Sequence, residues 1–322
     1  MKGQAKDIFR KYGTAGILIV LFIFFSTQSD SFLSVNNILN LLRQTSITGI
    51  ISVGMMIVML TGGIDLSVSA IVAISAMVCS ACMVNLNINM YLSVLFALAA
   101  GLAAGLVNGA LVTYIKIPPL IATLGTQTAI RGLAYIMTNG YTIYGFPKAF
   151  NYLGKGYVGV IPVPVIIMVI VLIVGWYAVN HTKFGRYLYA IGGNGEASRL
   201  SGINTNLRLI IAYVISGGLA ALAGVVELSR LNSGQPNAGE GYEMSAITAV
   251  VLGGISVSGG EGKFSGVVFG ILIMGILSSG LVMMNISTYY QQLIKGLVLL
   301  FAVSIDQILK LNLFSKSKRV RS

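Results

Sequence analysis

The sequence contains no Asp, Glu, Lys or Arg between Asp65 and Lys116, a stretch long enough for two bilayer crossings at about 20 residues each. Apolar stretches of similar length recur along the rest of the chain, together with one shorter stretch. They are 14–32, 46–64, 66–84, 91–113, 120–138, 161–180, 209–228, 264–284 and 290–308, and the shorter one is 244–257. We therefore expect an all-α integral membrane protein with about ten transmembrane helices.

The composition excludes a soluble globular protein. Hydrophobic residues make up 56% of the 322 residues and charged residues 9%, whereas a soluble domain carries about 25% charged residues. The net charge of +12 would suit a nucleic-acid-binding protein. Here, however, the basic residues lie in short stretches between apolar ones, as in the loops that set the orientation of membrane helices. We expect no nucleic-acid partner.

The distribution of basic residues predicts that both ends of the chain are cytoplasmic. With ten spans and the N-terminus inside, 15 of the 21 Lys and Arg residues face the cytoplasm, four face outward, and Arg131 and Lys295 lie within spans. Such an excess is typical of cytoplasmic loops. This orientation requires the stretch 244–257 to cross, although it is interrupted by glycine and short enough for a re-entrant segment.

No constellation of residues indicates catalysis, a metal site or a cofactor. The single histidine, His181, has no partner motif for a metal or a Ser/His pair. The segment 259–263 resembles a phosphate loop, but it lacks the first glycine and the Ser or Thr after the lysine, so the chain should not bind ATP. Cys79 and Cys82 have C-x-x-C spacing without a second pair, and we expect them to be small buried side chains.

Polar residues in or beside the spans are candidates for lining a translocation pathway: Asp65, Asn108, Gln127 and Arg131. An arginine at mid-helix costs about 2.5–3.5 kcal/mol on insertion scales, so its helix should face protein or water there. Glu227 is a candidate ion-pair partner of Arg131. A structural ion pair between them is the alternative to a role of Arg131 in the pathway. Asp65 follows two glycines, so its alternative role is to cap the next helix.

Four further patterns concern helix packing, an internal repeat and the membrane surfaces. Gly101, Gly105 and Gly109 share one helix face, where another backbone can approach closely. The segments 60–69 and 252–258 are similar in sequence, which is a weak sign of an internal repeat. Lys295 and Asp306, near opposite ends of the last span, should extend toward the membrane surfaces. The stretch 33–43 is expected to be an interfacial segment.

The longest inner loop, 181–208, carries four basic residues. Its middle, Asn194-Gly-Glu-Ala-Ser-Arg-Leu-Ser-Gly202, predicts a short helix that ends at a glycine. The long outer loop, 139–160, is rich in Gly, Tyr and Asn and is expected to be irregular.

Six short motifs occur in the same order as in one family of membrane proteins. They are Leu60-Thr-Gly-Gly-Ile-Asp-Leu-Ser-Val68, Ile121-Ala-Thr-Leu-Gly125, Ile191-Gly-Gly-Asn194, Arg199-Leu-Ser-Gly-Ile-Asn204, Gly241-Tyr-Glu243 and Ala249-Val-Val-Leu-Gly-Gly254. Together they cover nearly the whole chain and resemble ribose-type permeases. These are membrane subunits of bacterial ABC importers in the branched-chain amino acid/monosaccharide permease superfamily.

The resemblance implies a type II ABC importer permease fold, with residues 1–322 as a single transmembrane permease domain in the bacterial inner membrane. Its function would be the import of ribose or another simple monosaccharide by alternating access. The implied partners are a second permease copy in a homodimer, a cytoplasmic ATP-binding subunit that holds ATP and Mg²⁺, and an extracytoplasmic sugar-binding protein.

In such permeases the long inner loop holds the helix that couples transport to the ATPase. By resemblance this role falls on Gly193, Asn194, Glu196, Ala197, Ser198, Arg199, Leu200, Ser201 and Gly202. One departure concerns the substrate. The family usually has Glu-Leu-Asp-Ala where this chain has Glu243-Met-Ser245-Ala, so a role for an acid at position 245 is lost.

Two alternatives stay open. One is a permease of the same superfamily for branched-chain amino acids or another small solute. The other is an ion-coupled secondary transporter, which should carry acidic or histidine relays inside its spans. The acids in or beside the spans are limited to Asp65, Glu227 and Asp306, all near helix ends, which argues against ion coupling.

Overall fold

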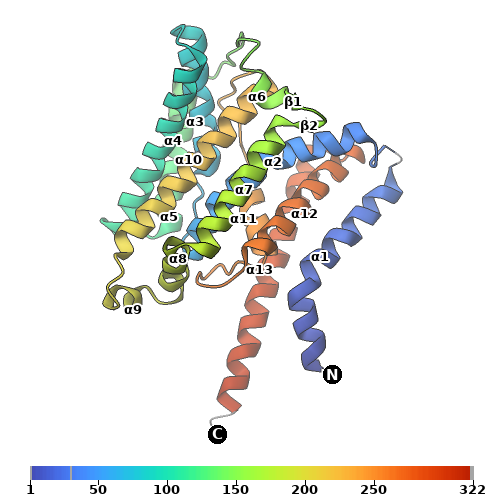
Figure 1. The fold of residues 1–322 in the computed structure, drawn as a ribbon, viewed down its shortest axis with the longest axis vertical. Helices are drawn as coiled ribbons and strands as arrows, with labels where there is room; N and C mark the ends of the chain where they lie inside the picture. Colours follow the sequence, from blue (N-terminus) through green and yellow to red (C-terminus); the bar gives the residue numbers. More distant parts are fainter. Residues whose placement is uncertain (1, 30, 320–322) are drawn as a thin grey trace.

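The chain folds into a bundle of long helices with one small hairpin at its edge (Figure 1). The computed structural model describes the backbone of residues 2–29 and 31–319 and the side chains of 14–29, 31–304, 307 and 308. Asp306, which was expected to extend toward a membrane surface, lies outside the described side chains.

The elements follow one another as helices, apart from one antiparallel pair of two-residue strands. They are α1 (Lys2–Gln28), α2 (Val35–Leu60), α3 (Val68–Ser80) with a π-helical turn (Ala81–Asn85), α4 (Met90–Thr113), α5 (Pro119–Ile136), α6 (Tyr152–Lys155), β1 (Tyr157–Val158), β2 (Ile161–Pro162), α7 (Val163–His181), α8 (Lys183–Gly193), α9 (Gly195–Leu200), α10 (Thr205–Leu231), α11 (Tyr242–Leu252), α12 (Phe264–Met283) and α13 (Thr288–Arg319).

Within the described residues, six helices are long and apolar enough to cross a membrane. They are α2, α3 with its π-helical turn, α4, α7, α10 and α12. Two shorter apolar helices are Thr14–Gln28, which is the apolar part of α1, and α11. The prediction of an all-α membrane protein is confirmed.

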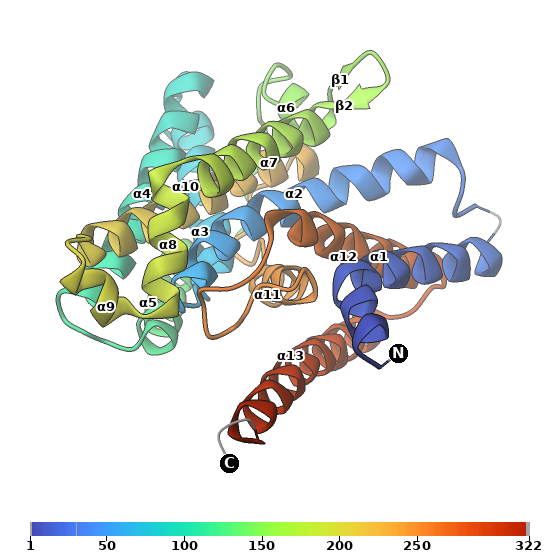
Figure 2. The same ribbon diagram turned by 60° about the horizontal axis from the view of Figure 1, so that its bottom comes forward.

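Helix α2 forms the centre of the bundle and contacts α7, α10, α11 and α12 (Figure 2). Its residues from Gly49 to Leu60 are all buried, which places the apolar core around its second half. Its first turns are capped by Ser34, whose hydroxyl accepts the Asn37 N–H at 3.3 Å. Most of the stretch 33–43, which was expected to be interfacial, forms the first turns of α2, and its position relative to a membrane surface stays a prediction.

The predicted glycine face lies on α4, where it meets the backbone of α10. A Cβ atom on Gly109 would lie 2.8 Å from the Ile210 Cα, and one on Gly105 would overlap the Tyr213 carbonyl oxygen. Gly101 meets Gly217 in the same way. Since no side chain separates the two helices, their backbones pack in direct contact, as predicted.

The shorter stretch 244–257 is not a spanning helix by itself. Helix α11 has 11 residues, a length of about 16 Å at 1.5 Å per residue, against a hydrocarbon core of about 30 Å. Residues 253–257 form a turn after it, and residues 232–241 approach its start from α10 without helical structure. Two glycines at positive φ break the helical pattern here, Gly241 before α11 and Gly254 after it.

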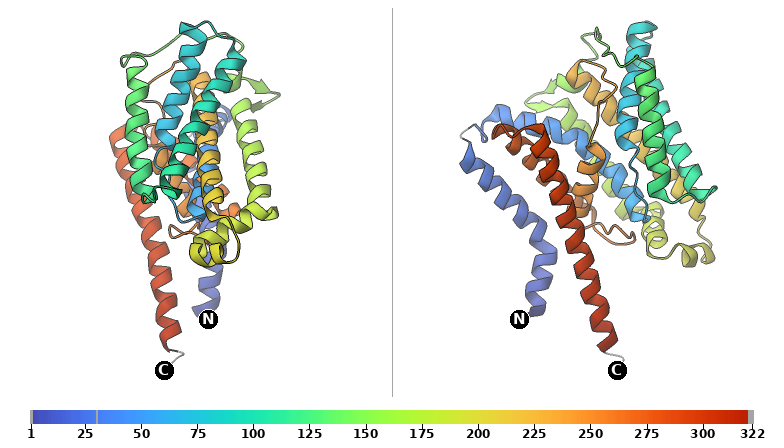
Figure 3. Two further views of the ribbon diagram at one scale, coloured as in Figure 1. Left: turned by 90° about the vertical axis from the view of Figure 1, so that its left-hand side faces the viewer. Right: turned by 180° about the vertical axis from the view of Figure 1, so that it is seen from behind.

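Both ends of the described chain point toward the end of the bundle where α9 lies, while α6 and the hairpin lie at the opposite end (Figures 1 and 3). The loop 139–160, which was expected to be irregular, contains α6 and β1 and leads into β2. The hairpin pairs Tyr157 with Pro162 and Val158 with Ile161 around a glycine at φ +62°.

Candidate translocation pathway and coupling region

Asp65 lies in the turn between α2 and α3 and is fully buried. One carboxylate oxygen accepts the Ser67 N–H at 3.1 Å and the Ser67 hydroxyl at 2.6 Å. The other accepts the Ser216 hydroxyl of α10 at 2.8 Å. The carboxylate therefore accepts the N–H of the residue that precedes α3, a role similar to the helix cap predicted for it. It also joins this turn to α10, which the sequence did not predict.

Asn108 of α4 extends the same network toward α5. Its side-chain amide donates to the Ser67 hydroxyl at 2.7 Å, and its carbonyl oxygen accepts the Thr126 hydroxyl at 2.6 Å. The next residue, Gln127, donates to the Ser69 hydroxyl at 3.1 Å. Three of the four predicted pathway residues thus meet around the start of α3. Asn108 is fully buried and Gln127 is half-buried.

Arg131, one turn further along α5, is half-buried and does not pair with Glu227 as expected. Its guanidinium donates to the backbone carbonyls of Pro236 at 3.0 Å and Ala238 at 2.7 Å. Glu227 instead accepts the Tyr242 hydroxyl at 2.6 Å. The physical reason is that residues 232–241 have no helical partners for their carbonyls, and a five-donor guanidinium satisfies two of them.

The predicted short helix of the inner loop is present as α9. The Asn194 side chain accepts the Ala197 N–H at 2.9 Å and caps its start, and Gly202 follows its end at φ +83°. Of the nine residues assigned to coupling, Ser198 alone is buried, and the other eight are exposed. Leu200 is 75% exposed, so the helix presents an apolar side chain to its surroundings.

An ion pair crosses the exposed face of α9. The Arg199 guanidinium donates one hydrogen bond to each carboxylate oxygen of Glu196, at 2.6 Å and 3.1 Å. The hydrogen bond from Arg199, followed by its charge, lowers the pKa of the Glu196 carboxyl. Both side chains therefore stay charged at neutral pH.

The end of α8 meets the turns that follow α2 and α11, backbone against backbone. The Gly260 N–H donates to the Leu60 carbonyl at 2.9 Å. A Cβ atom on Gly192 would overlap both the Leu60 oxygen and the Gly260 nitrogen. We call this contact the glycine junction: Leu60, Gly62, Gly192, Gly259 and Gly260. It joins the α8–α9 loop directly to the turn that holds Asp65.

The turns after α2 and α11 share one geometry. Each helix ends two residues before a glycine in the left-handed region, Gly62 at φ +83° and Gly254 at φ +84°. In each turn a polar side chain, Asp65 or Ser256, then accepts the N–H of the serine two residues further on, at 3.1 Å in both cases. The two turns are therefore similar but not in sequence register, because the left-handed residue is the first glycine of Gly62-Gly63 and the second of Gly253-Gly254.

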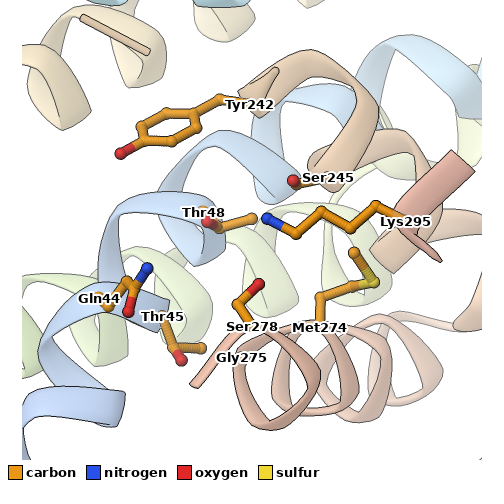
Figure 4. Close-up of a pocket in the computed structure, with 9 residues that line it drawn as sticks. All are labelled: Gln44, Thr45, Thr48, Tyr242, Ser245, Met274, Gly275, Ser278 and Lys295. Carbon is orange, nitrogen blue, oxygen red and sulfur yellow. The ribbon is translucent and has the colours of Figure 1, made fainter. Parts of the chain in front are cut away.

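A polar pocket that the sequence did not reveal lies between α2, α11, α12 and α13 (Figure 4). It is lined by Gln44, Thr45, Thr48, Tyr242, Ser245, Met274, Gly275, Ser278 and Lys295. Lys295 was expected to extend toward the membrane surface, but its side chain points from α13 into this pocket. That expectation is wrong, because polar groups of three other helices offer the ammonium a closer polar environment.

Cys79 and Cys82 are both buried, as expected, and both are free thiols. They lie where α3 passes into its π-helical turn. Among the described residues, no group of three or more His, Cys, Asp or Glu side chains lies close enough to hold a metal ion.

Comparison with known proteins identifies relatives over nearly the whole chain. The family model described as "Branched-chain amino acid transport system / permease component" matches residues 37–303. The ribose import permease protein of Escherichia coli strain K12 is 45% identical over 293 residues, covering 90% of this chain and 91% of that protein. The Bacillus subtilis strain 168 ribose import permease protein is 45% identical over 302 residues, covering 93% and 94%.

The D-allose transport system permease protein of Escherichia coli strain K12 is 38% identical over 302 residues, covering 93% of this chain and 92% of that protein. No solved structure matches the chain at a significant level.

Proposed function

The chain belongs to the family of branched-chain amino acid transport system permease components, and on that premise we propose that it is the membrane subunit of an ATP-driven bacterial importer of monosaccharides. The observation that carries the proposal is the similarity, over nine-tenths of the chain, to permeases named for ribose and allose. Ribose or another simple monosaccharide is the proposed substrate. The protein resides in the bacterial inner membrane as a multi-pass protein.

The proposed topology has ten crossings with both termini in the cytoplasm, and residues 1–322 form one transmembrane domain. Two observations support it: the charge distribution of the loops, and the common direction of both chain ends and α9 in Figure 3. In this topology residues 232–252 cross as a non-helical half followed by the half-helix α11. Arg131 lowers the cost of placing the non-helical half in a membrane, because its guanidinium donates hydrogen bonds to two carbonyls of that half.

The proposed coupling element is α9, which would dock on a separate ATP-binding subunit. Its exposed ion pair and the exposed Leu200 supply the polar and apolar contacts of such a surface. A movement of α9 would pass through α8 to the glycine junction and from there to the turn that holds Asp65. The hydrogen bonds from this turn through Asn108 to α5 then connect the ATPase side to Gln127 and Arg131.

The proposed translocation pathway runs between two copies of this chain, along α5. Gly125 and Gly132 support a second copy there, because nothing lies within 4 Å of the position of a Cβ atom on either. A homodimer would bring two α5 helices together and place Gln127 and Arg131 of each copy beside the solute. An extracytoplasmic sugar-binding protein would deliver the solute. ATP would switch the pathway only if it binds one state of the complex more tightly than the other.

The test of this proposal is the Arg199→Ala variant in the reconstituted complex of permease, ATP-binding subunit and sugar-binding protein. We expect the variant to lose stimulation of ATP hydrolysis by the sugar-loaded binding protein. Binding of that protein to the outer face should be unchanged. Lys155→Ala removes an exposed cation from the opposite end of the bundle and is the matched control. Equal stimulation in wild type and Arg199→Ala would refute the role of α9.

A further inference from the structure

The polar pocket contains a cation without a counter-charge. Figure 4 shows the Lys295 side chain crossing from α13 toward Thr48, with Ser245 on one side and Ser278 on the other. No Asp or Glu lines the pocket. Within the part of the chain that the structure describes, the Lys295 ammonium makes no ion pair, and no side-chain hydrogen bond to it is found. A charge inside a membrane protein is normally paired, because an isolated one is costly there.

Neither Glu227, which contacts Tyr242, nor Glu243, which follows Tyr242 in α11, lines the pocket. The Glu227 carboxylate accepts the Tyr242 hydroxyl. Its second oxygen has no hydrogen-bond partner in the structure. No carboxylate therefore lines the pocket, and the ammonium keeps its three donors for another group.

The remaining lining groups suit an anion. Thr45, Thr48 and Ser278 each bring a hydroxyl and Gln44 brings an amide, and all four groups can donate a hydrogen bond. The other two hydroxyls donate elsewhere, that of Ser245 to the Gly241 carbonyl and that of Tyr242 to Glu227. The Thr45 hydroxyl is buried and has no partner in the structure. Charge-assisted hydrogen bonds to an anion are shorter and about twice as strong as neutral ones.

The pocket has room for a small ligand. Its cavity volume is about 40 Å³, whereas a cavity of about 10–15 Å³ already holds one water molecule. A chloride or nitrate ion therefore fits. The pocket also lies inside the bundle: Lys295 is seven residues after the start of α13, a depth of about 10 Å at 1.5 Å per residue.

We propose that this pocket binds one small monovalent anion, of the size of chloride or nitrate, between the Lys295 ammonium and the hydroxyls of α2 and α12. The anion supplies the missing counter-charge. It also ties α13, which packs chiefly on α11, to α2 and α12. The test of this site uses no sugar, so its failure would be distinguishable from a failure of the proposed function.

The test is thermal unfolding of the purified full-length chain in detergent, in sodium chloride, sodium nitrate and sodium gluconate at equal ionic strength. Gluconate is a much larger organic anion. Since a ligand that binds only the folded state raises its stability, we expect the Tm in chloride and nitrate to exceed that in gluconate by about 2 °C or more. Equal Tm values in the three salts would overturn the proposal.

Two variants and one control separate the site from general salt effects. Lys295→Met should abolish the difference between chloride and gluconate, while the exposed Lys155→Met should retain it. Ser245→Asp places a fixed carboxylate in the pocket, so its Tm in gluconate should rise and its salt dependence should vanish. An unchanged chloride shift in Ser245→Asp or in folded Lys295→Met would overturn the proposal. So would a shift produced by phosphatidylglycerol but not by chloride, which would assign the ammonium to a lipid phosphate.

Discussion

The glycine junction predicts that alanine has different effects at two adjacent residues, Gly192 and Gly193. Both end α8, and neither has a positive φ. A Cβ atom on Gly192 would overlap the Leu60 oxygen and the Gly260 nitrogen, both main-chain atoms that no rotamer change can remove. On Gly193 a Cβ atom would have nothing within 4 Å. Gly192→Ala should therefore force two turns apart, and Gly193→Ala should not.

The magnitude follows from packing. Inserting a methyl group into a filled contact costs about 1–3 kcal/mol, and the gain of Ala over Gly in a helix, at most about 1 kcal/mol, applies to both variants. The difference between the variants is thus about 1–3 kcal/mol in favour of Gly193→Ala. Because about 1 kcal/mol shifts the Tm of a large domain by about 2–4 °C, Gly192→Ala should unfold several degrees lower.

The assay is thermal unfolding of both variants in the same detergent and salt, followed by ATPase stimulation of Gly192→Ala in the reconstituted complex. We expect the weakened junction to lower this stimulation by the sugar-loaded binding protein. Equal Tm values for Gly192→Ala and Gly193→Ala would refute the close contact. A destabilised Gly192→Ala with full stimulation would leave the contact but refute its role in coupling.

Three further substitutions test the network and the helix packing. Arg131→Met leaves two carbonyls without partners and should lower stability by about 1–3 kcal/mol for each, measured as a fall in Tm, while Arg131→Lys should recover part of the loss. Asp65→Asn turns one carboxylate oxygen into a donor facing the Ser216 hydroxyl, and a fall in Tm with reduced sugar uptake is expected; unchanged values would count against the network. Gly105→Ala places a methyl group against the Tyr213 carbonyl and should lower the Tm by several degrees, whereas Gly125→Ala, on an open face, should unfold like wild type.

The sequence predicts those features that depend on local pattern. Apolar length locates the long helices, the four-residue spacing of Gly101, Gly105 and Gly109 finds the contact face of α4, and the capping residues around Asn194 and Gly202 find α9. Each of these signals lies within one segment, where helix geometry alone relates the residues.

Contacts between distant segments could not be predicted in this way. The partners of Arg131 are carbonyls of a non-helical segment about a hundred residues later, and a carbonyl carries no signature in the sequence. Lys295 meets groups from three other helices, so the pocket exists only once those helices are packed. The glycine junction is similar, because its three segments are joined by backbone atoms alone.

The most direct test of the central claim is ATP hydrolysis by the reconstituted complex of this permease, its ATP-binding subunit and its binding protein. The proteins encoded beside its gene are the source of both partners. We expect ATP hydrolysis to rise only when the binding protein carries a monosaccharide, with ribose as the first sugar to try. Stimulation by a branched-chain amino acid instead of any sugar would contradict the proposed substrate, and uptake driven by an ion gradient without the ATP-binding subunit would contradict the importer itself.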